Sequence, residues 1–397
     1  MLHRYIYLLT ISAFLSITVF EVFLIFGVVY TIFHILKTKR LDGMLSIPLL
    51  MFISSTILST LLFFPKMIIK SLGEGGNQII YFLPVNKTHV LEFKKRLPHI
   101  FISLGVILSP VFFYNFYFKD RLKLLWGGPF EVGQFYAIFS ISSLLLMIRE
   151  VRNGRNNLAL IYFVLSVLFI GIVILSARRS ALLALLVVLF IFIFILFRDS
   201  FIERRYLAFP IVATLTLCIF GYIYLSYKDH RFQLLNEVIL GKRSISEEVL
   251  NSISSSRWNI MKDGLIIIEN DLKEGRFVNI LLGHGVRSGL YLPHKYGPQN
   301  WERYESIFVI SEFIEKGLVG LMGILLIFIL SFKKVLSFRV RKTEDILTLV
   351  LFMPLLLHLV GSVFTFFWDA ILPLYLLLFK LGESRTALSK NGAYGRT

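Results

Sequence analysis

Two adjacent arginines interrupt a strongly apolar run near the middle of the chain. Arg178 and Arg179 lie in VILSARRSALLALLVVLF, residues 173–190. An arginine inside a bilayer costs about 2.5–3.5 kcal/mol on insertion scales, so it is kept there only with a partner, water or a functional role. The planar guanidinium group can hold an anion through two parallel hydrogen bonds. The pair is therefore either an anion-binding site or an anchor that reaches from a short turn to lipid headgroups.

The composition identifies the surroundings of this pair. Hydrophobic residues make up 56% of the 397 residues and charged residues only 17%, which is typical of a polytopic membrane protein. The net charge of +17 would suggest nucleic acid as the partner of a soluble chain. Here the basic residues gather in short segments between apolar runs, as the positive-inside rule requires. We therefore exclude nucleic acid and expect the lipid bilayer.

The apolar runs predict an all-α fold: a polytopic integral membrane protein with about ten to twelve transmembrane helices of roughly 20 residues each. The clear spans lie near residues 5–34, 44–64, 98–118, 133–148, 158–176, 180–197, 206–226 and 306–332, with a pair within 346–380. The region 65–98 could hold a short span or an interfacial helix. We expect four parts: an N-terminal transmembrane bundle (1–226), one large polar loop with amphipathic helices (227–305), C-terminal transmembrane helices (306–380) and a cytoplasmic tail (381–397).

Three short basic loops set the orientation. They cover residues 149–157, 198–205 and 333–345, and their Lys and Arg content marks them as cytoplasmic. The turn at 177–180 and the large loop 227–305 then fall on the opposite face. The arginine pair and the large loop are thus predicted to meet at one membrane surface.

The first part of the large loop predicts an amphipathic helix. In NSISSSRWNIMKDGLIIIEN the serines 254–256 could cap a helix that carries Trp258, Met261, Leu265 and Ile268 along one face. Such a helix would lie on the membrane surface or cover a cavity.

The second part of the loop contains a glycine-rich turn, LLGHGVRSG (281–289), and leads into ISEFIEKGLVGLMGILL. That span begins with charged residues and continues with Gly317, Gly320 and Gly323. Small residues at this spacing allow helices to pack closely in lipid.

The order of these features resembles the O-antigen polymerase and O-antigen ligase superfamily of bacterial envelope glycosyltransferases. Its members have a tight outer hairpin with an SR-type arginine (here LSARRSALL), a large periplasmic loop that opens with an RW helix (SSSRWNIMKDGL), a GxG turn (LLGHG) and a glutamate-glycine-glycine entry into the next span (FIEKGLVGL). The resemblance covers residues 125–380 and includes GGPFEVGQFYA.

The resemblance implies a multi-pass protein of the bacterial inner (cytoplasmic) membrane with its active site on the periplasmic face. It implies transfer of a glycan from undecaprenyl pyrophosphate to an acceptor hydroxyl, without a metal or other cofactor. The expected partners are the undecaprenyl-pyrophosphate-linked glycan, an acceptor glycan or lipid A core, the bilayer, and an optional chain-length regulator.

The resemblance also implies catalytic residues. The family arginine maps best onto Arg179, with Arg178 as the close second. Guanidinium groups would hold the pyrophosphate and stabilise the charge that develops as the glycosidic bond breaks. Glu305, at the membrane edge of the loop, is the candidate base for the acceptor hydroxyl.

Four further residues are expected to bind substrate. The loop arginine of the family maps onto Arg257, and Glu315 matches the glutamate of the entering span. Arg287 and His284 are candidates because they lie in the glycine-rich turn. For each of them the alternative is an ordinary solvated, interfacial or turn residue.

One departure favours a polymerase over a ligase. Ligases place a histidine about eleven residues before the glycine of the entering span, and that count back from Gly317 reaches Ser306. His284 or His294 could substitute spatially. Two other classes stay open. A transporter of lipid-linked sugars predicts paired repeats with broken helices, and a non-catalytic scaffold predicts that Arg179 tolerates lysine or glutamine.

Overall fold

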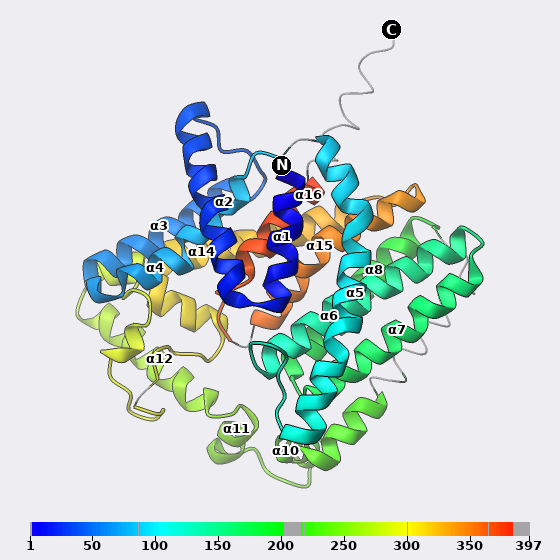
Figure 1. Cartoon of the computed structure of the whole chain (residues 1–397). Coiled ribbons are helices and arrows are strands. Elements are labelled where there is room, and N and C mark those ends of the chain that lie inside the picture. Colours follow the sequence, from blue (N-terminus) through cyan, green and yellow to red (C-terminus); the bar gives the residue numbers. More distant parts are fainter. Residues whose placement is uncertain are drawn as a thin grey trace.

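The computed structural model describes residues 2–85, 87–201, 216, 219–299, 301–363 and 365–383, and these residues form helices and loops without a strand (Figure 1). The helices of the first half are α1 (Leu2–Leu15), α2 (Ile17–Thr38), α3 (Ser46–Phe63), η1 (Pro65–Met67), α4 (Ile68–Glu74), η2 (Gly76–Phe82), α5 (Lys87–Lys119), α6 (Pro129–Arg152), α7 (Asn156–Leu175) and α8 (Arg179–Arg198). Those of the second half are α10 (His230–Ile239), α11 (Glu247–Ile253), α12 (Arg257–Lys273), α13 (Phe277–Leu282), η3 (Ser288–Leu290), α14 (Phe308–Ser337), α15 (Thr343–Ser362) and α16 (Leu372–Glu383).

Eight of the described helices are long and apolar enough to cross a membrane: α2, α3, α5 from Val90, α6, α7, α8, α14 and α15. The expectation of a polytopic, all-helical membrane protein is confirmed at this level. The expected span at 206–226 falls largely outside the described residues, as does most of the expected tail 381–397. At 12 residues, α16 is shorter than the roughly 20 that a crossing needs.

The N-terminal apolar run, predicted as one span from 5 to 34, is two helices. Ser16 has an extended backbone (φ −158°, ψ 116°), and its side chain accepts a hydrogen bond from Val19 N at 3.5 Å, which caps α2. The break leaves α1 with only 14 residues. The ambiguous region 65–98 contains the short helices η1, α4 and η2 and the beginning of α5, which continues through Pro98.

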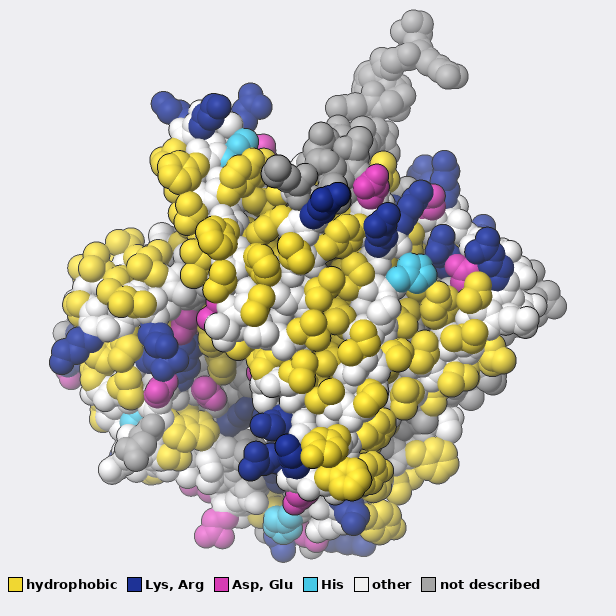
Figure 2. Space-filling model, viewed as in Figure 1, with side chains coloured by type: hydrophobic (Ala, Val, Ile, Leu, Met, Phe, Trp, Pro, Cys, Tyr) yellow, Lys and Arg dark blue, Asp and Glu magenta, His cyan; other side chains and the backbone are white. Residues whose placement is uncertain are grey.

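The core lies around α6 and α15, in each of which 94% of the apolar stretch is buried. Aromatic side chains of three helices interlock there: Phe14 of α1 lies 5.6 Å from Phe101 of α5 and 4.6 Å from Phe135 of α6, measured between ring centroids. By contrast, only 22% of α2 is buried. Hydrophobic side chains cover the middle of the face in Figure 2, while Lys and Arg side chains gather toward its ends. This distribution suits a bilayer as solvent.

Close packing of α3 on α14 depends on glycine. A Cβ on Gly320 would lie 3.0 Å from Ser55 Oγ, and one on Gly323 would lie 2.7 Å from Pro48 O. The predicted role of these glycines in helix packing is confirmed.

The helices of the large loop lie together at one end of the bundle, where α10, α11 and α12 follow one another in Figure 1. The three basic loops meet at the opposite end of α8, where residues of all three line one pocket. Their predicted placement on one face is confirmed. A 20-residue helix such as α8 is about 30 Å long, so it separates the two ends by about the thickness of a bilayer core.

Candidate functional site

A cavity of about 790 Å³ lies where the first turn of α8 meets the loop helices. Its wall is mainly apolar, with aliphatic side chains from α7, α8 and the helical residues 219–228. Four arginines also line it: Arg178, Arg179, Arg231 and Arg257. The predicted meeting of the arginine pair with the large loop is therefore confirmed, and the face in Figure 2 is hollowed next to a group of Lys and Arg side chains.

The four arginines occupy equivalent places in three helices. Arg178 is the N-cap of α8 and Arg179 its first residue, Arg231 is the second residue of α10, and Arg257 is the first of α12. The N-terminus of a helix carries a partial positive charge and favours anions, so a cation there is electrostatically unfavourable. Placing arginines in three such first turns around one cavity builds a strongly positive site.

The turn that carries the arginine pair is held by a close helix contact. Ala177 has a left-handed backbone (φ 52°), and Ser176 Oγ donates a hydrogen bond to Val173 O at 2.6 Å. Gly133 of α6 faces this turn. A Cβ on Gly133 would lie 2.7 Å from Ala181 Cβ and 3.4 Å from Arg178 Cβ. The tight hairpin thus depends on the absence of a side chain at residue 133.

Arg178 and Arg257 are both half-buried in this setting. Burial lowers the pKa of each guanidinium from its ordinary value, the nearby arginine charges lower it further, and Glu305 opposes the effect. Arginine nevertheless stays protonated at neutral pH. The Nε of Arg178 is buried and has no hydrogen-bond partner among the described residues. It is a donor left available for an anion.

Arg231 is a site residue that the sequence did not reveal. Its Nε donates to Asp229 Oδ1 at 2.9 Å and its Nη1 donates to Ser255 Oγ at 3.1 Å. The hydrogen bonds from Arg231 lower the pKa of Asp229, so this carboxylate is ionised. The neighbouring Phe232 lies under the Arg179 guanidinium, 5.8 Å from ring centroid to Cζ. The available signal was the position of Arg231 in the first turn of a helix, two residues after the capping Asp229.

Helix α12 covers the cavity, as one of the two expectations for it proposed. Ser254 accepts a hydrogen bond from Trp258 N at 3.0 Å and so satisfies one donor of the first turn, whereas the side chain of Ser256, the N-cap residue, makes no capping bond. Trp258 and Met261 line the cavity, but Leu265 is 48% exposed. The first half of the predicted apolar face therefore lines the cavity, while Ile268 packs against the buried cluster that contains Ile260 and Ile267. The buried residues of α12 are Ile260, Asp263, Gly264, Ile267 and Asp271.

Glu305 is half-buried at the edge of the cavity, next to Ser306, which lines it. Burial raises the pKa of Glu305 above the ordinary carboxyl value, while the charges of Arg303 and Arg257 act against the rise. Glu305 makes no hydrogen bond or ion pair with side chains in the described parts of the chain. Its position therefore suits a group that accepts a proton.

Three of the predicted substrate-binding residues do not line the cavity. His284 is buried, with its Nε2 2.7 Å from Asp271 Oδ2 and its Nδ1 3.0 Å from Asn279 Nδ2. Arg287 pairs with Glu302 at 2.5 Å. Glu315 belongs to a buried ion cluster described below. The sequence placed them in the same loop and span as the site, but it could not show which way each side chain points.

The glycine-rich turn and the entry of α14 form one joint. Gly317 has φ 60° inside α14, and a Cβ there would lie 2.4 Å from Gly283 N. At this break His284 N donates to Ile314 O at 2.7 Å, and Gly285 N donates to Glu315 O at 2.9 Å. The two motifs quoted for the family resemblance are therefore halves of one backbone contact.

A buried ion cluster braces this joint. Lys316 Nζ lies 2.5 Å from Glu312 Oε2 and 3.3 Å from Glu315 Oε2. Arg303 pairs with Glu74 of α4 and lies 3.5 Å from Glu315 Oε2. All five side chains are at most 7% exposed. Separating any of these groups would leave a buried charge without its partner, which is strongly destabilising. The cluster therefore holds the loop residue Arg303 against α4 and α14.

The charged groups define what the cavity can bind. Among the residues that the structure describes, His, Cys, Asp and Glu form no group of three that could hold a metal ion. The cavity instead combines guanidinium groups with a long apolar wall. That combination suits a ligand with an anionic head and a hydrocarbon chain.

No protein-family model matches the chain. The chain is 49% identical over 381 residues to a protein of Aquifex aeolicus (strain VF5) described as an uncharacterized protein, and the match covers 96% of each chain. This chain belongs to the family of that protein. Because the match takes in nearly the whole chain, the transmembrane bundle and the large loop are together the common unit of this family.

Proposed function

We propose that this protein is a membrane glycosyltransferase that moves a glycan from undecaprenyl pyrophosphate to an acceptor hydroxyl, and that it acts as a polymerase of surface polysaccharide such as O-antigen. The observation that carries the proposal is the cavity itself. Four arginines from three helix first turns line a mainly apolar cavity of about 790 Å³. A lipid pyrophosphate has the matching division into a multiply charged head and a hydrocarbon chain.

Arg178 and Arg179 are the groups that would hold the pyrophosphate, with Arg231 and Arg257 closing around it from the loop. Each guanidinium can form two parallel bonds to phosphate oxygens. The apolar wall of Leu182, Leu183 and Leu186 would receive the first isoprene units. A low-dielectric wall also strengthens the attraction between the arginines and the pyrophosphate.

The reaction follows from this placement. The acceptor hydroxyl oxygen attacks the anomeric carbon of the donor glycan, and a new glycosidic bond forms. The bond between that carbon and the phosphate oxygen breaks, and undecaprenyl pyrophosphate leaves with the electron pair. The hydroxyl proton passes to Glu305, whose raised pKa makes it a better base than an ordinary exposed carboxylate. The arginines stabilise the charge on the leaving group.

The polymerase is favoured over the ligase because no described residue that lines the cavity is a histidine. His284 is engaged with Asp271, and His294 Nε2 donates to Gly289 O at 2.8 Å and stacks on Tyr304. Neither stands where the histidine of a ligase would be needed. We place the protein in the bacterial inner membrane with this cavity on the periplasmic face, opposite the three basic loops. A chain-length regulator would act as an additional partner.

The first experiment is to delete the gene in the native host and to compare the lipid-linked and lipid A-linked glycan pools. A polymerase leaves lipid A core capped by a single repeat unit without a ladder. Long polymer stranded on undecaprenyl pyrophosphate would indicate a ligase instead. Repeat units trapped on the cytoplasmic leaflet would indicate transport, and an unchanged profile would contradict a glycan role in that host.

Complementation then tests the site. Arg179→Ala and Arg179→Lys should both fail to restore the ladder, because lysine lacks the two-pronged guanidinium. Arg155→Ala is the matched control, since Arg155 is an exposed arginine at the opposite end of the bundle. The proposal is refuted if both Arg179 variants restore full glycan length at expression equal to the control.

A further inference from the structure

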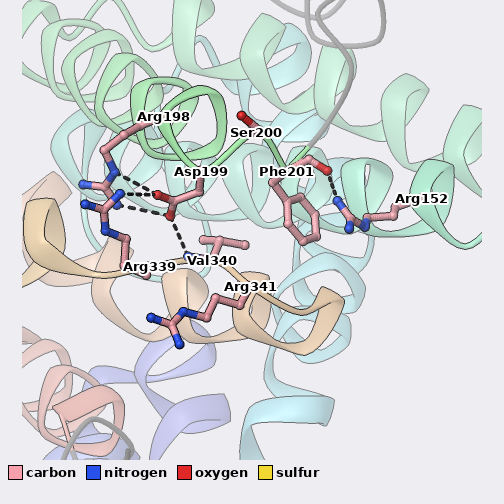
Figure 3. A pocket seen from close by; sticks show the side chains of 8 residues that line it. All are labelled: Arg152, Arg198, Asp199, Ser200, Phe201, Arg339, Val340 and Arg341. Carbon is pink, nitrogen blue, oxygen red and sulfur yellow. Dashed lines mark hydrogen bonds and ion pairs between the residues drawn. The ribbon is translucent and has the colours of Figure 1, made fainter.

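The end of α8 opposite the proposed active site carries a second arginine cluster, which forms a pocket of about 480 Å³ (Figure 3). We name it the basic pocket. Its lining residues are Arg152, Arg198, Asp199, Ser200, Phe201, Arg339, Val340 and Arg341. They come from the end of α6, the end of α8 and the connection between α14 and α15.

A single carboxylate organises the basic pocket. Asp199 accepts hydrogen bonds from Arg198 Nε at 2.9 Å, from Arg339 Nη1 at 2.8 Å and from Val340 N at 2.7 Å (Figure 3). The hydrogen bonds from Arg198, Val340 and Arg339 outweigh burial and lower the pKa of Asp199 to about 2. Asp199 is therefore ionised at neutral pH, and it ties α8 to the connection between α14 and α15.

The other two arginines have no carboxylate partner among the described residues. The Arg152 guanidinium stacks 3.9 Å from the centroid of the Phe201 ring and donates to Phe201 O. The Arg341 side chain makes no hydrogen bond or ion pair within the described segments, and only its backbone N–H donates, to Asp345. The described residues that line the pocket include four arginines and one carboxylate, which gives this lining an excess of positive charge.

The positive-inside rule accounts for basic residues on one face but does not require them to share a pocket. Here three separate loops converge. The guanidinium groups of Arg152 and Arg341 lie in the same pocket as those of Arg198 and Arg339, which are hydrogen-bonded to Asp199. Basic pockets between transmembrane helices at this level bind phosphate headgroups of anionic lipids. The turn of α8 that precedes Arg198 carries exposed apolar side chains: Phe194 is 48% and Phe197 is 50% exposed. They provide a surface for acyl chains next to a site for phosphate.

We propose that the basic pocket binds the phosphodiester headgroup of an anionic phospholipid of the surrounding leaflet. Arg152 and Arg341 contact the phosphate directly, while Asp199 holds Arg198 and Arg339 in place. The chemistry recognised is a phosphate ester. A lipid is the expected source because the pocket lies at the end of α8, a helix long and apolar enough to cross a membrane, whose last turns carry exposed apolar side chains. This proposal stands independently of the glycosyltransferase proposal.

The test uses the purified full chain and measures its binding to nanodiscs or vesicles of phosphatidylcholine with a graded content of phosphatidylglycerol or cardiolipin. Arg152→Gln with Arg341→Gln removes two charges from the pocket. The matched control is Arg155→Gln with Lys342→Gln, which removes two exposed charges from the same loops outside the pocket. The pocket variant should bind anionic lipid about tenfold more weakly than the control.

Equal weakening by the two double variants overturns the proposal, because it would assign the binding to diffuse surface charge. Lack of preference for anionic lipid over phosphatidylcholine overturns it as well. Inorganic phosphate or glycerol phosphate that displaces the lipid at low millimolar concentration would assign the pocket to a soluble phosphate compound and overturn the lipid assignment. The single variant Arg341→Gln removes a guanidinium that makes no hydrogen bond or ion pair within the described chain, so a partial loss of binding remains measurable should the double variant be unstable.

Discussion

Replacing Gly133 by alanine tests whether the arginine hairpin is held by the contact between α6 and the turn before α8. The added Cβ would lie 2.7 Å from Ala181 Cβ and 3.1 Å from Ser176 Oγ. Carbon atoms pack best at about 3.5–4.0 Å, so the turn must move by about 1 Å. Neither neighbour is the flexible end of a long side chain, and the backbone of the turn has to move with them.

Two consequences follow from that displacement. Overpacking of a well-filled interior costs about 1–3 kcal/mol, which exceeds the gain of up to about 1 kcal/mol from replacing glycine by alanine in a helix. The variant should therefore be less stable. A displacement of about 1 Å at a reacting group can lower the rate by about 100-fold, so glycan polymerisation should fall far more than stability does.

Gly171→Ala is the matched control. Gly171 lies in helix α7, and a Cβ there would meet no atom of the described residues within 4 Å. This variant should be unchanged or more stable by up to about 1 kcal/mol, with normal activity. The assays are the melting temperature of the purified protein in detergent and polymer length formed from lipid-linked repeat units. If Gly133→Ala behaves like Gly171→Ala in both assays, the packing argument for the hairpin is refuted.

Three further outcomes are expected. Arg231→Gln should lower the activity about 10- to 100-fold, the value of one charge-assisted hydrogen bond to an anion. Glu305→Gln should lower the rate about 100- to 10,000-fold and remove the acid limb of the rate-pH profile. In the unmodified protein that limb lies above the ordinary carboxyl range, because burial raises the pKa of Glu305 and the rate falls as the base is protonated. Lys316→Met should lower the free energy of unfolding by about 3–5 kcal/mol, since it leaves the buried Glu312 without its cation and Glu315 with Arg303 alone.

Controls from the same regions separate these effects from general damage. Arg243→Gln removes an exposed arginine of the loop that pairs with Glu237 at 3.1 Å, and it should leave activity unchanged. Glu302→Gln should keep the acid limb that Glu305→Gln removes. Adding Glu312→Gln to Lys316→Met should recover part of the lost stability; a Lys316→Met protein as stable as the original would contradict the account of the ion cluster.

The sequence predicted the membrane class and the meeting of the arginine pair with the loop, because hydropathy and charge act over whole segments. Arg257 could be placed near Arg178 and Arg179 for the same reason: the number of spans between them is even. Arg231 was not predicted as a site residue because a single basic residue in a polar segment carries no periodic signal. The helix break at Ser16 was not predicted because the apolar run continues on both sides of it.

The spacing of residues along the sequence did not predict which way individual side chains point or which partners they contact. Glu315 was visible as a charge at the start of a span, but the spacing did not show that Arg303 of the loop pairs with it. Arg303 in turn pairs with Glu74, which lies 229 residues away in sequence. His284 likewise turns to Asp271 because the backbone of the glycine-rich turn is fixed by α14. Such pairings depend on the packed fold and not on local pattern.

Helix α8 has an arginine cluster at each of its two ends, and the difference between the two clusters bears on function. At its last turn the arginines of the basic pocket agree with the rule that places positive charge on one face of the membrane, and Asp199 compensates part of their charge. At its first turn Arg178 and Arg179 place charge at the opposite end of the same helix. They stand at a helix N-terminus and line one cavity with Arg231, which pairs with Asp229, and Arg257. Orientation cannot explain charge at both ends of one helix. The cluster at the first turn raises the energy of the empty protein, and an anion that enters the cavity removes this cost, which is why binding and transfer of a lipid pyrophosphate is the function to test there.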